Sequence, residues 1–168
     1  MALIPYSSSS STRGRGSKHD VFISFRGEDT RKKFTDHLYA GLEQKGISTF
    51  RDDKNLDGGT PIGPGLFKAI EESKFAVVIL SSDYASSSWC LIELAKIVDC
   101  MKMTGLVVLP VFHYVDPSDL RNHQKGIYAE AFKKHEEPSK DSNEEDVRMW
   151  KAALTEVANI AGWDLRDR

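Results

Sequence analysis

Short apolar runs alternate along the chain with segments in which apolar residues recur every three or four positions. Four runs are typical of β-strands, and they span residues 21–25, 47–50, 75–80 and 106–112. The run at 75–80 is apolar without alternation, which predicts a central strand covered on both faces. Pro110 cannot donate a backbone hydrogen bond, so the last run indicates an edge strand or a bulge. The pattern shows no obvious fifth strand.

Two segments in the first half of the chain have the periodicity of amphipathic helices. The first begins near Arg31 and ends at Gly46, since glycine commonly terminates a helix. A loop rich in glycine and proline, at 52–65, separates the second strand from the second helix. The apolar positions of these two helices are Phe34, Leu38 and Leu42, and then Leu66, Phe67 and Ile70.

The second half of the chain predicts three more helices. The serines at 86–88 can cap the first of them, and a short helix follows at 126–135. An acidic loop at 136–146 leads to the last helix. The inward positions of the capped helix and the last helix are Cys90, Leu94, Ile97 and Met101, and then Val147, Trp150, Leu154, Val157 and Ala161. Strands that alternate with helices favour an α/β fold with a parallel sheet.

Composition and charge exclude several classes of protein. The 168 residues are 40% hydrophobic and 29% charged, which suits one globular domain with a buried core. A net charge of -2 lacks the basic footprint of a dedicated nucleic-acid binder. No apolar run reaches the roughly 18–20 residues of a membrane span. Cys90 and Cys100 form no Cys-x-x-Cys pair, so we expect two free thiols and an intracellular, reducing location.

Residues 1–17 differ from the rest of the chain. They contain a serine run, Ser7 to Ser11, and an Arg-Gly-Arg-Gly stretch, with few apolar residues. The cluster Ala2-Leu3-Ile4 is much shorter than the apolar core of about 7–15 residues that a signal peptide needs. We therefore expect a disordered, serine-rich leader, with ordered structure beginning at Asp20.

Several catalytic motifs are missing from the sequence. Neither G-x-G-x-x-G nor G-x-x-x-x-G-K-[ST] follows the first strand, which argues against the usual phosphate cradles, and no G-x-S-x-G nucleophile elbow is present. The five histidines never lie four residues apart on one predicted helix, so no zinc centre is expected. A phospho-receiver would need a lysine after a fifth strand, and Glu28, Asp29 and Asp83 fit its carboxylates only loosely.

Open parallel sheets bind ligands at the carboxyl ends of their strands, where the strand order reverses. If the order is 2-1-3-4-5, this crevice lies between the first and third strands. It is then lined by residues 26–30 and 81–93, with the loop at 55–62 at its rim. Trp89 and Glu93 lie one helical turn apart and share a face at this crevice. A solvated glutamate that makes no special contact is the alternative interpretation.

A single carboxylate beside a tryptophan suits one class of reaction. Cleavage of a glycosidic bond passes through an oxocarbenium-like state that a carboxylate stabilises. A second carboxylate usually protonates the leaving group, but a pyridinium such as nicotinamide leaves as a neutral molecule without that help. A tryptophan face beside a cationic ring adds roughly 0.5–2 kcal/mol. Glu93 is therefore a candidate for cleaving a nicotinamide–ribose bond.

Several stretches, taken in order, resemble the motifs of plant TIR domains. They are Asp20-Val21-Phe22-Ile23-Ser24-Phe25-Arg26-Gly27-Glu28-Asp29-Thr30-Arg31, Ala69-Ile70-Glu71-Glu72-Ser73, Tyr84 to Cys90 with Glu93-Leu94, Val115-Asp116-Pro117-Ser118-Asp119 and Gly162-Trp163-Asp164-Leu165. The resemblance covers about residues 18–168 and is to the N-terminal domain of immune receptors of the TIR nucleotide-binding leucine-rich-repeat type. It implies a single TIR domain with a flavodoxin-like parallel sheet of order 2-1-3-4-5, flanked by helices on both faces.

The resemblance also implies an activity. The family suggests a hydrolase that cleaves NAD+ on self-association, needs no cofactor, and acts in the cytoplasm, or in cytoplasm and nucleus, to trigger immune signalling and cell death. NAD+ is the expected substrate, and use of NADP+ stays open. We expect neither a membrane nor a nucleic-acid partner. Glu93 falls on the catalytic position, and the positions of the nicotinamide–ribose pocket fall on Arg26, Gly27, Ser87 and Trp89.

The same resemblance places two surfaces for self-association. One is the loop at 54–65 after the second strand, and the other uses the first and last helices. Many members carry Ser-His in the first helix and a basic residue in the loop, where this chain has Asp36-His37 and Gly58. The residues expected to mediate self-association are Asp36, His37, Gly59 and Ile62. A module that signals only by oligomerising, without catalysis, is the alternative function.

Overall fold

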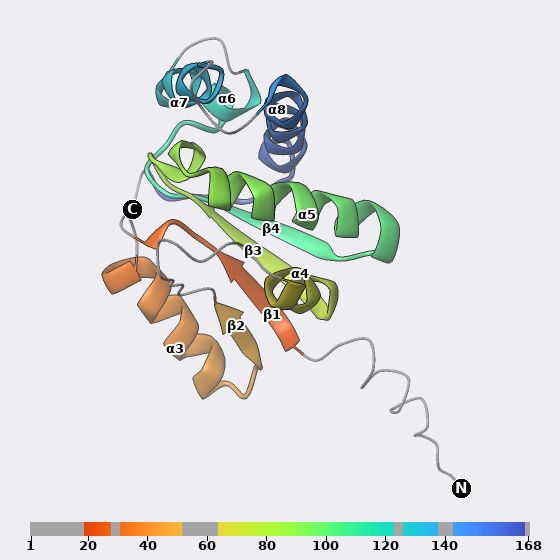
Figure 1. Ribbon diagram of the computed structural model, residues 1–168. Coiled ribbons are helices and arrows are strands. Elements are labelled where there is room, and N and C mark those ends of the chain that lie inside the picture. Colours follow the sequence, from red (N-terminus) through yellow and green to blue (C-terminus); the bar gives the residue numbers. More distant parts are fainter. Residues whose placement is uncertain (1–18, 28–30, 52–63, 123–125, 138–142, 167–168) are drawn as a thin grey trace, which may run out of the picture.

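The computed structural model of this protein describes residues 19–27, 31–51, 64–122, 126–137 and 143–166. The predicted leader and most of the predicted loop at 52–65 lie outside these residues. Five parallel strands form one sheet in the order β2-β1-β3-β4-β5, which confirms the expected order (Figure 1). The strands are β1 (His19–Ser24), β2 (Thr49–Arg51), β3 (Ser73–Leu80), β4 (Val107–Phe112) and β5 (Trp163–Asp164).

Helices and short helical turns connect these strands. They are η2 (Arg31–Thr35), α3 (Asp36–Gln44), α4 (Pro64–Glu71), η3 (Tyr84–Ser86), α5 (Ser88–Thr104), α6 (Pro117–Arg121), α7 (Ile127–His135) and α8 (Glu144–Ala158). Local sequence accounts for several of their ends. Gly46 after α3 and Gly105 after α5 have φ values of 80° and 81°, a left-handed conformation that glycine adopts without strain. Asn143 caps α8, because its side chain accepts a hydrogen bond from the Asp146 amide at 2.8 Å.

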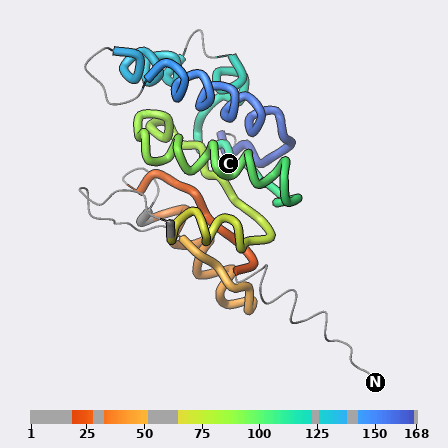
Figure 2. Tube along the Cα trace, turned by 45° about the vertical axis from the view of Figure 1, so that its right-hand side comes forward, coloured from red at the N-terminus to blue at the C-terminus, as the bar shows by residue number. Residues whose placement is uncertain are grey.

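The helices divide between the two faces of the sheet. α4, α5 and α8 pack on one face, while α3 packs on the other (Figures 1 and 2). Alternation along β1 matches this division, since Phe22 points to the α5 side and Val21 and Ile23 point to the α3 side. No helix among the described residues is long and apolar enough to cross a membrane.

The described residues leave part of the sheet uncovered on the α3 side. An apolar groove of about 580 Å³ lies there between α3 and the sheet. Its lining includes Phe34 from η2, Leu38 from α3, Val77 from β3, Leu109 from β4 and Leu165 after β5. Parallel sheets normally bury both faces, so the core on this side is incompletely covered by the part of the chain described.

The structure differs from the sequence-based predictions in the second half of the chain. The pattern missed β5 and α6. The expectation of a bulge at Pro110 is wrong, because β3 and β4 pair in continuous register through Pro110. The expectation of an edge holds locally, because β5 pairs only with Val111 and Phe112 among the described residues. α8 begins at Glu144, inside the predicted acidic loop. Ala161, which was expected on this helix, lies beyond its end and is exposed.

Candidate functional site

The carboxyl ends of β1 and β3 lie side by side, as the predicted crevice requires. β1 ends at Ser24, whose partner in the parallel register is Val78 of β3. Arg26 and Gly27 follow β1 and are partly buried, whereas residues 28–30 lie outside the described chain. β3 leads into Ser81, η3 and then the N-terminus of α5. The strand order therefore brings together two segments that are far apart in the sequence.

The N-terminus of α5 is fixed by its cap and by a contact to β1. The Ser87 side chain accepts a hydrogen bond from the Cys90 amide at 3.2 Å, so Ser87 is the N-cap of α5. The Cys90 thiol donates to the Phe25 carbonyl at 3.7 Å, which joins the helix to the end of β1. Trp89 is partly buried one turn before Glu93. Ser87 and Trp89 thus lie at the N-terminus of α5, near the end of β1.

Glu93 is buried beneath this edge, with only 2% of its surface exposed. The Ser24 hydroxyl donates to Glu93 Oε1 at 2.8 Å, across 69 residues of sequence. Ser24 Oγ also lies 2.7 Å from the Tyr84 hydroxyl oxygen, and that hydroxyl lies 3.2 Å from the Cys90 carbonyl oxygen. The alternative of a solvated glutamate is therefore wrong, because this carboxyl group is buried and hydrogen-bonded.

The electrostatics of the cluster centre on Tyr84. Burial raises the pKa of Tyr84 well above its usual value, and the neighbouring Cys90 and Glu93 raise it further, while the Ser24 hydrogen bond lowers it. The Tyr84 hydroxyl therefore keeps its proton at any pH at which the protein is handled, and it acts as a donor. A buried charge needs hydrogen bonds to offset lost solvation, and the Ser24 hydroxyl supplies one to Glu93.

Side chains of α7 support the backbone between β3 and α5. The Tyr128 hydroxyl donates to the Ser81 carbonyl, and His135 Nε2 lies 2.7 Å from the Ala85 carbonyl oxygen. His135 packs edge-on against the Trp150 ring, with the centroids 5.4 Å apart. Sequence reasoning missed Ser24, Tyr84 and these two α7 residues. Ser24 could have been found as the one polar residue inside an apolar strand run.

The residues expected to mediate self-association fall in three places. Asp36 begins α3 and forms an ion pair with Arg51, with Asp36 Oδ1 2.6 Å from Arg51 Nη1. His37, the next residue, is exposed on α3. Gly59 and Ile62 lie outside the described residues. α3 and α8 pack on opposite faces of the sheet, so within one domain they do not form one continuous surface (Figure 1).

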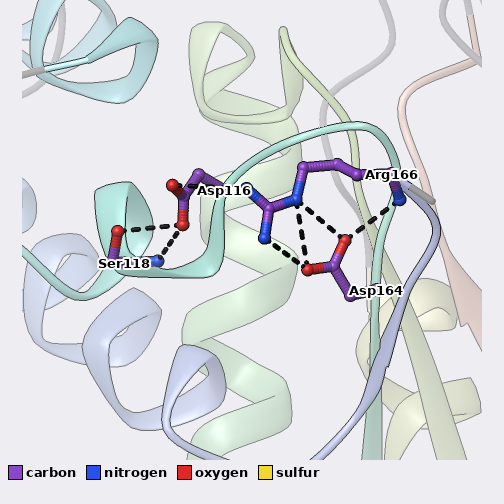
Figure 3. A network of polar contacts seen from close by, with 4 residues as sticks. All are labelled: Asp116, Ser118, Asp164 and Arg166. Atoms are coloured by element: carbon purple, nitrogen blue, oxygen red, sulfur yellow. Dashed lines mark hydrogen bonds and ion pairs between the residues drawn. The ribbon is translucent and has the colours of Figure 1, made fainter.

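A second polar cluster lies at the same edge of the sheet, beyond β4 and β5 (Figure 3). Asp116 caps α6 and accepts from the Ser118 amide at 3.0 Å and from the Ser118 hydroxyl at 2.9 Å. Arg166 Nη2 lies 2.7 Å from Asp164 Oδ2, and Arg166 Nη1 lies 3.3 Å from Asp116 Oδ2. The Ser118 hydrogen bonds, with a smaller effect from Arg166, lower the pKa of Asp116. This cluster fastens the end of β5 to the start of α6.

The described residues contain no group of three or more His, Cys, Asp or Glu side chains arranged to hold a metal ion. Cys90 and Cys100 are buried as free thiols. Burial raises the pKa of Cys100, so this thiol is poorly suited to ionise. Among the described residues, Glu93 is the one buried carboxyl group, and it lies near the ends of β1 and β3.

Comparison with known proteins gives concordant results. The family model described as "TIR domain" matches residues 18–168. The disease resistance protein RPV1 of Vitis rotundifolia is 53% identical over 163 residues, which are 96% of this chain and 11% of RPV1. The TMV resistance protein N of Nicotiana glutinosa is also 53% identical over 163 residues, which are 96% of this chain and 14% of that protein. The chain therefore spans only 11–14% of the length of these two relatives.

A solved structure supports the same assignment. It is the structure of the activated Roq1 resistosome directly recognizing the pathogen effector XopQ, in its TIR domains. The TM-score is 0.80 and the sequence identity is 54%, with 89% of this chain and 89% of that chain covered.

Proposed function

The chain belongs to the TIR domain family, and on that premise we propose that it is an NAD+ glycohydrolase whose turnover depends on self-association. In this proposal it is the signalling domain of a plant disease-resistance receptor, it acts inside the cell, and its cleavage of NAD+ triggers immune signalling and cell death. One observation carries the proposal: a buried carboxyl group, Glu93, lies at the carboxyl edge between β1 and β3. Buried ionisable groups in such crevices are candidates for catalysis.

The proposed reaction breaks the bond between the nicotinamide nitrogen and the ribose carbon. The bonding electron pair moves to the pyridinium nitrogen, so nicotinamide leaves as a neutral molecule and the ribose becomes an oxocarbenium-like cation. Ionised Glu93 stabilises that cation. Water then adds to the cation and releases a proton, which yields ADP-ribose. No cofactor is required, because the positive charge on the pyridinium of the substrate already makes nicotinamide a good leaving group.

Other residues of the crevice have proposed roles in binding. Trp89 precedes Glu93 by one turn, and its ring can contact the cationic nicotinamide before the bond breaks. Arg26, Gly27 and Ser87 lie around the same edge and form the proposed nicotinamide–ribose pocket. Discrimination between NAD+ and NADP+ depends on contacts to the adenosine half of the substrate. The four residues named here are proposed to contact the nicotinamide–ribose half.

Self-association is the second part of the proposal. The Roq1 TIR domains come from an activated resistosome, which supports assembly as the active state of a close relative. The exposed position of His37 supports a contact surface on α3. Asp36 is engaged with Arg51, so it shapes this surface by orienting that guanidinium. We propose Gly59 and Ile62 as part of a second contact.

The burial of Glu93 favours a second candidate function. Because its carboxyl group is only 2% exposed and is hydrogen-bonded to Ser24, it has the surroundings of a structural group in this state. An oligomerising module without catalysis would need Glu93 only for folding. The two candidates differ in one respect: the catalytic proposal requires the charge of Glu93, and the module requires only its size and hydrogen bonds.

The discriminating experiment is NAD+ consumption by the purified protein over a range of protein concentrations. Glu93→Gln preserves the size of the side chain and removes its charge, and Glu130→Gln on the exposed surface of α7 is the matched control. We expect turnover that rises faster than linearly with concentration, is lost in Glu93→Gln and is unchanged in Glu130→Gln. Glu93→Gln must still self-associate, as measured by sedimentation. Full turnover by Glu93→Gln overturns the catalytic proposal.

A further inference from the structure

A chain of hydrogen bonds runs from η3 through β1 to the carboxyl group on α5. The direction of each hydrogen bond follows from the number of hydrogen atoms that each group can donate. An ionised carboxylate only accepts, so the single hydrogen of the Ser24 hydroxyl goes to Glu93 Oε1 at 2.8 Å. Ser24 Oγ must then accept at its 2.7 Å contact with Tyr84. The chain therefore runs Tyr84 to Ser24 to Glu93, with both donors pointing toward the carboxylate.

The surroundings of Ser24 are otherwise apolar. Alternation places Ser24 on the same face of β1 as Phe22, and on the neighbouring β3 the residues on this face include Val78 and Leu80. Ser24 and Tyr84 are completely buried. A hydroxyl in such surroundings loses its hydration, so a hydrogen bond to a specific partner must compensate for the lost solvation free energy. The partner of Ser24 across the sheet is the carboxyl group of Glu93.

We propose that Ser24 and Tyr84 are positioning residues, which hold the Glu93 carboxylate in one orientation and favour its ionised form; this inference rests on the proposed function of Glu93. Ser24 acts directly, by donating to Oε1. Tyr84 acts through Ser24. Because the Ser24 oxygen accepts a hydrogen bond from Tyr84, the Ser24 hydrogen points away from Tyr84 and toward Glu93. Hydrogen bonds in a low-dielectric chain strengthen one another, so the second donor supports the first.

The structure argues against the view that the Tyr84 hydroxyl serves only to bind the nearby Cys90 carbonyl. That hydroxyl also approaches the Cys90 carbonyl, but the distance of 3.2 Å is longer than the 2.7 Å to Ser24 Oγ. The shorter contact is the stronger one for hydroxyl groups. The titratable groups that act on Tyr84 include Cys90 and Glu93 from α5 and Tyr128 from α7. The ring of Tyr84 would fill the core equally well without its hydroxyl.

The test compares variants that remove single hydroxyls, Ser24→Ala and Tyr84→Phe, with a matched control. Ser73→Ala removes another buried strand serine, whose hydroxyl donates to the Ala69 carbonyl at 2.7 Å. All three changes cost some stability, so stability alone does not distinguish the roles. The readouts are kcat, KM and the dependence of kcat/KM on pH.

We expect Ser24→Ala to lower kcat about tenfold or more with little change in KM, because a misoriented carboxylate binds substrate but stabilises the cation poorly. The acid limb of the pH profile should move to higher pH by about one unit, since loss of a donor disfavours the ionised form. Tyr84→Phe should shift both in the same direction by less. Ser73→Ala should leave kcat within about twofold and the acid limb unmoved.

A second readout does not depend on activity. In protein carrying ¹³C-labelled glutamate, the side-chain carboxyl signal of Glu93 is the one that disappears in Glu93→Gln. We expect its titration midpoint to move to higher pH in Ser24→Ala and to stay in place in Ser73→Ala. An unmoved midpoint and an unmoved acid limb in Ser24→Ala would overturn the inference. If Glu93→Gln is inactive while Ser24→Ala behaves as the wild type, only the positioning role fails; if Glu93→Gln is active, the proposed function fails.

Discussion

Gly162 is the position at which the chain entering β5 comes closest to β4. A Cβ atom placed on Gly162 would lie 2.2 Å from the Pro110 carbonyl oxygen and 2.8 Å from Pro110 Cγ. The first of these atoms belongs to the backbone, so it cannot rotate out of the way. Gly162→Ala must therefore move one of the two backbones, and the pairing of β4 with β5 over Val111 and Phe112 is the contact at stake.

The size of the effect follows from this geometry. Overpacking by one methyl group costs about 1–3 kcal/mol, and a clash with backbone belongs at the upper end of that range. Gly41 in α3 is the matched control, because a Cβ atom there meets nothing within 4 Å. Alanine is favoured over glycine inside a helix by about 0.5–1 kcal/mol. The same chemical change should thus destabilise the domain at Gly162 and stabilise it at Gly41.

Thermal denaturation followed by far-UV circular dichroism and tryptophan fluorescence measures both variants. For a domain of this size about 1 kcal/mol corresponds to roughly 2–4 °C in Tm, so Gly162→Ala should melt several degrees below the wild type. Gly41→Ala should melt at or above the wild-type temperature. Equal stability of Gly162→Ala and the wild type would show that the β5 segment shifts aside without cost, and the reasoning from the close contact would be refuted.

Three further predictions concern single contacts. Ser87→Ala removes the N-cap of α5 and should lower the free energy of unfolding by about 1 kcal/mol, while Ser87→Asp, measured beside it by urea denaturation, should retain most of that stability. Gly105→Ala places a Cβ at φ 81° in open space, so its cost in the same assay should be the conformational one of about 1–2 kcal/mol. The pKa of Asp116 is lowered, so its carboxylate stabilises the fold above pH 3.8 and loses this effect as the pH falls through the lowered pKa. The difference in melting temperature between the wild type and Asp116→Asn should therefore be present at neutral pH and disappear when the proteins are melted in acid.

The sheet could be predicted from the sequence because its central strands are long apolar runs. β1 and β3 contribute residues to the apolar clusters on both faces of the sheet, so most of their residues are apolar and stand out. β5 could not be found in this way, because it has two residues and Trp163 is 54% exposed. Its pairing depends on Val111 and Phe112, which lie about fifty residues earlier in the chain. Local patterning contains no information about such a contact.

The errors near α6 and α8 have a different cause, which is charge. Because acidic residues are hydrophilic, a run of them favours the prediction of a loop. Glu144 and Glu145 nevertheless lie in the first turn of α8, where the helix dipole favours negative charge. Asn143 supplies the cap that starts the helix there. In α6, Asp116 is the cap and Pro117 the first helical residue, a pair that could have predicted this short helix.

The position of the candidate site could be predicted more fully than its contacts. The strand order implied by the family resemblance, together with the spacing of one helical turn, predicts the position of Glu93 near the ends of β1 and β3, and the structure confirms that order. The partners of Glu93 could not be derived, because Ser24 and Tyr84 are 60 residues apart and meet only through the parallel register. Residues three or four apart on a helix are neighbours, so their proximity can be predicted from spacing alone. A contact between a strand and a helix depends instead on how the whole layer of helices packs on the sheet.

The burial of Glu93 connects the two parts of the proposed function. A carboxyl group that is 2% exposed cannot contact the ribose of a substrate in the state described, so turnover requires the crevice to change. Self-association is the proposed source of that change, because it can supply binding energy that the single domain lacks. Ser24 and Tyr84 would then hold the carboxylate in place while the crevice opens above it. On this argument, removing the Ser24 hydroxyl should reduce turnover per assembled domain without changing the concentration at which assembly occurs, whereas a change at His37 should do the reverse.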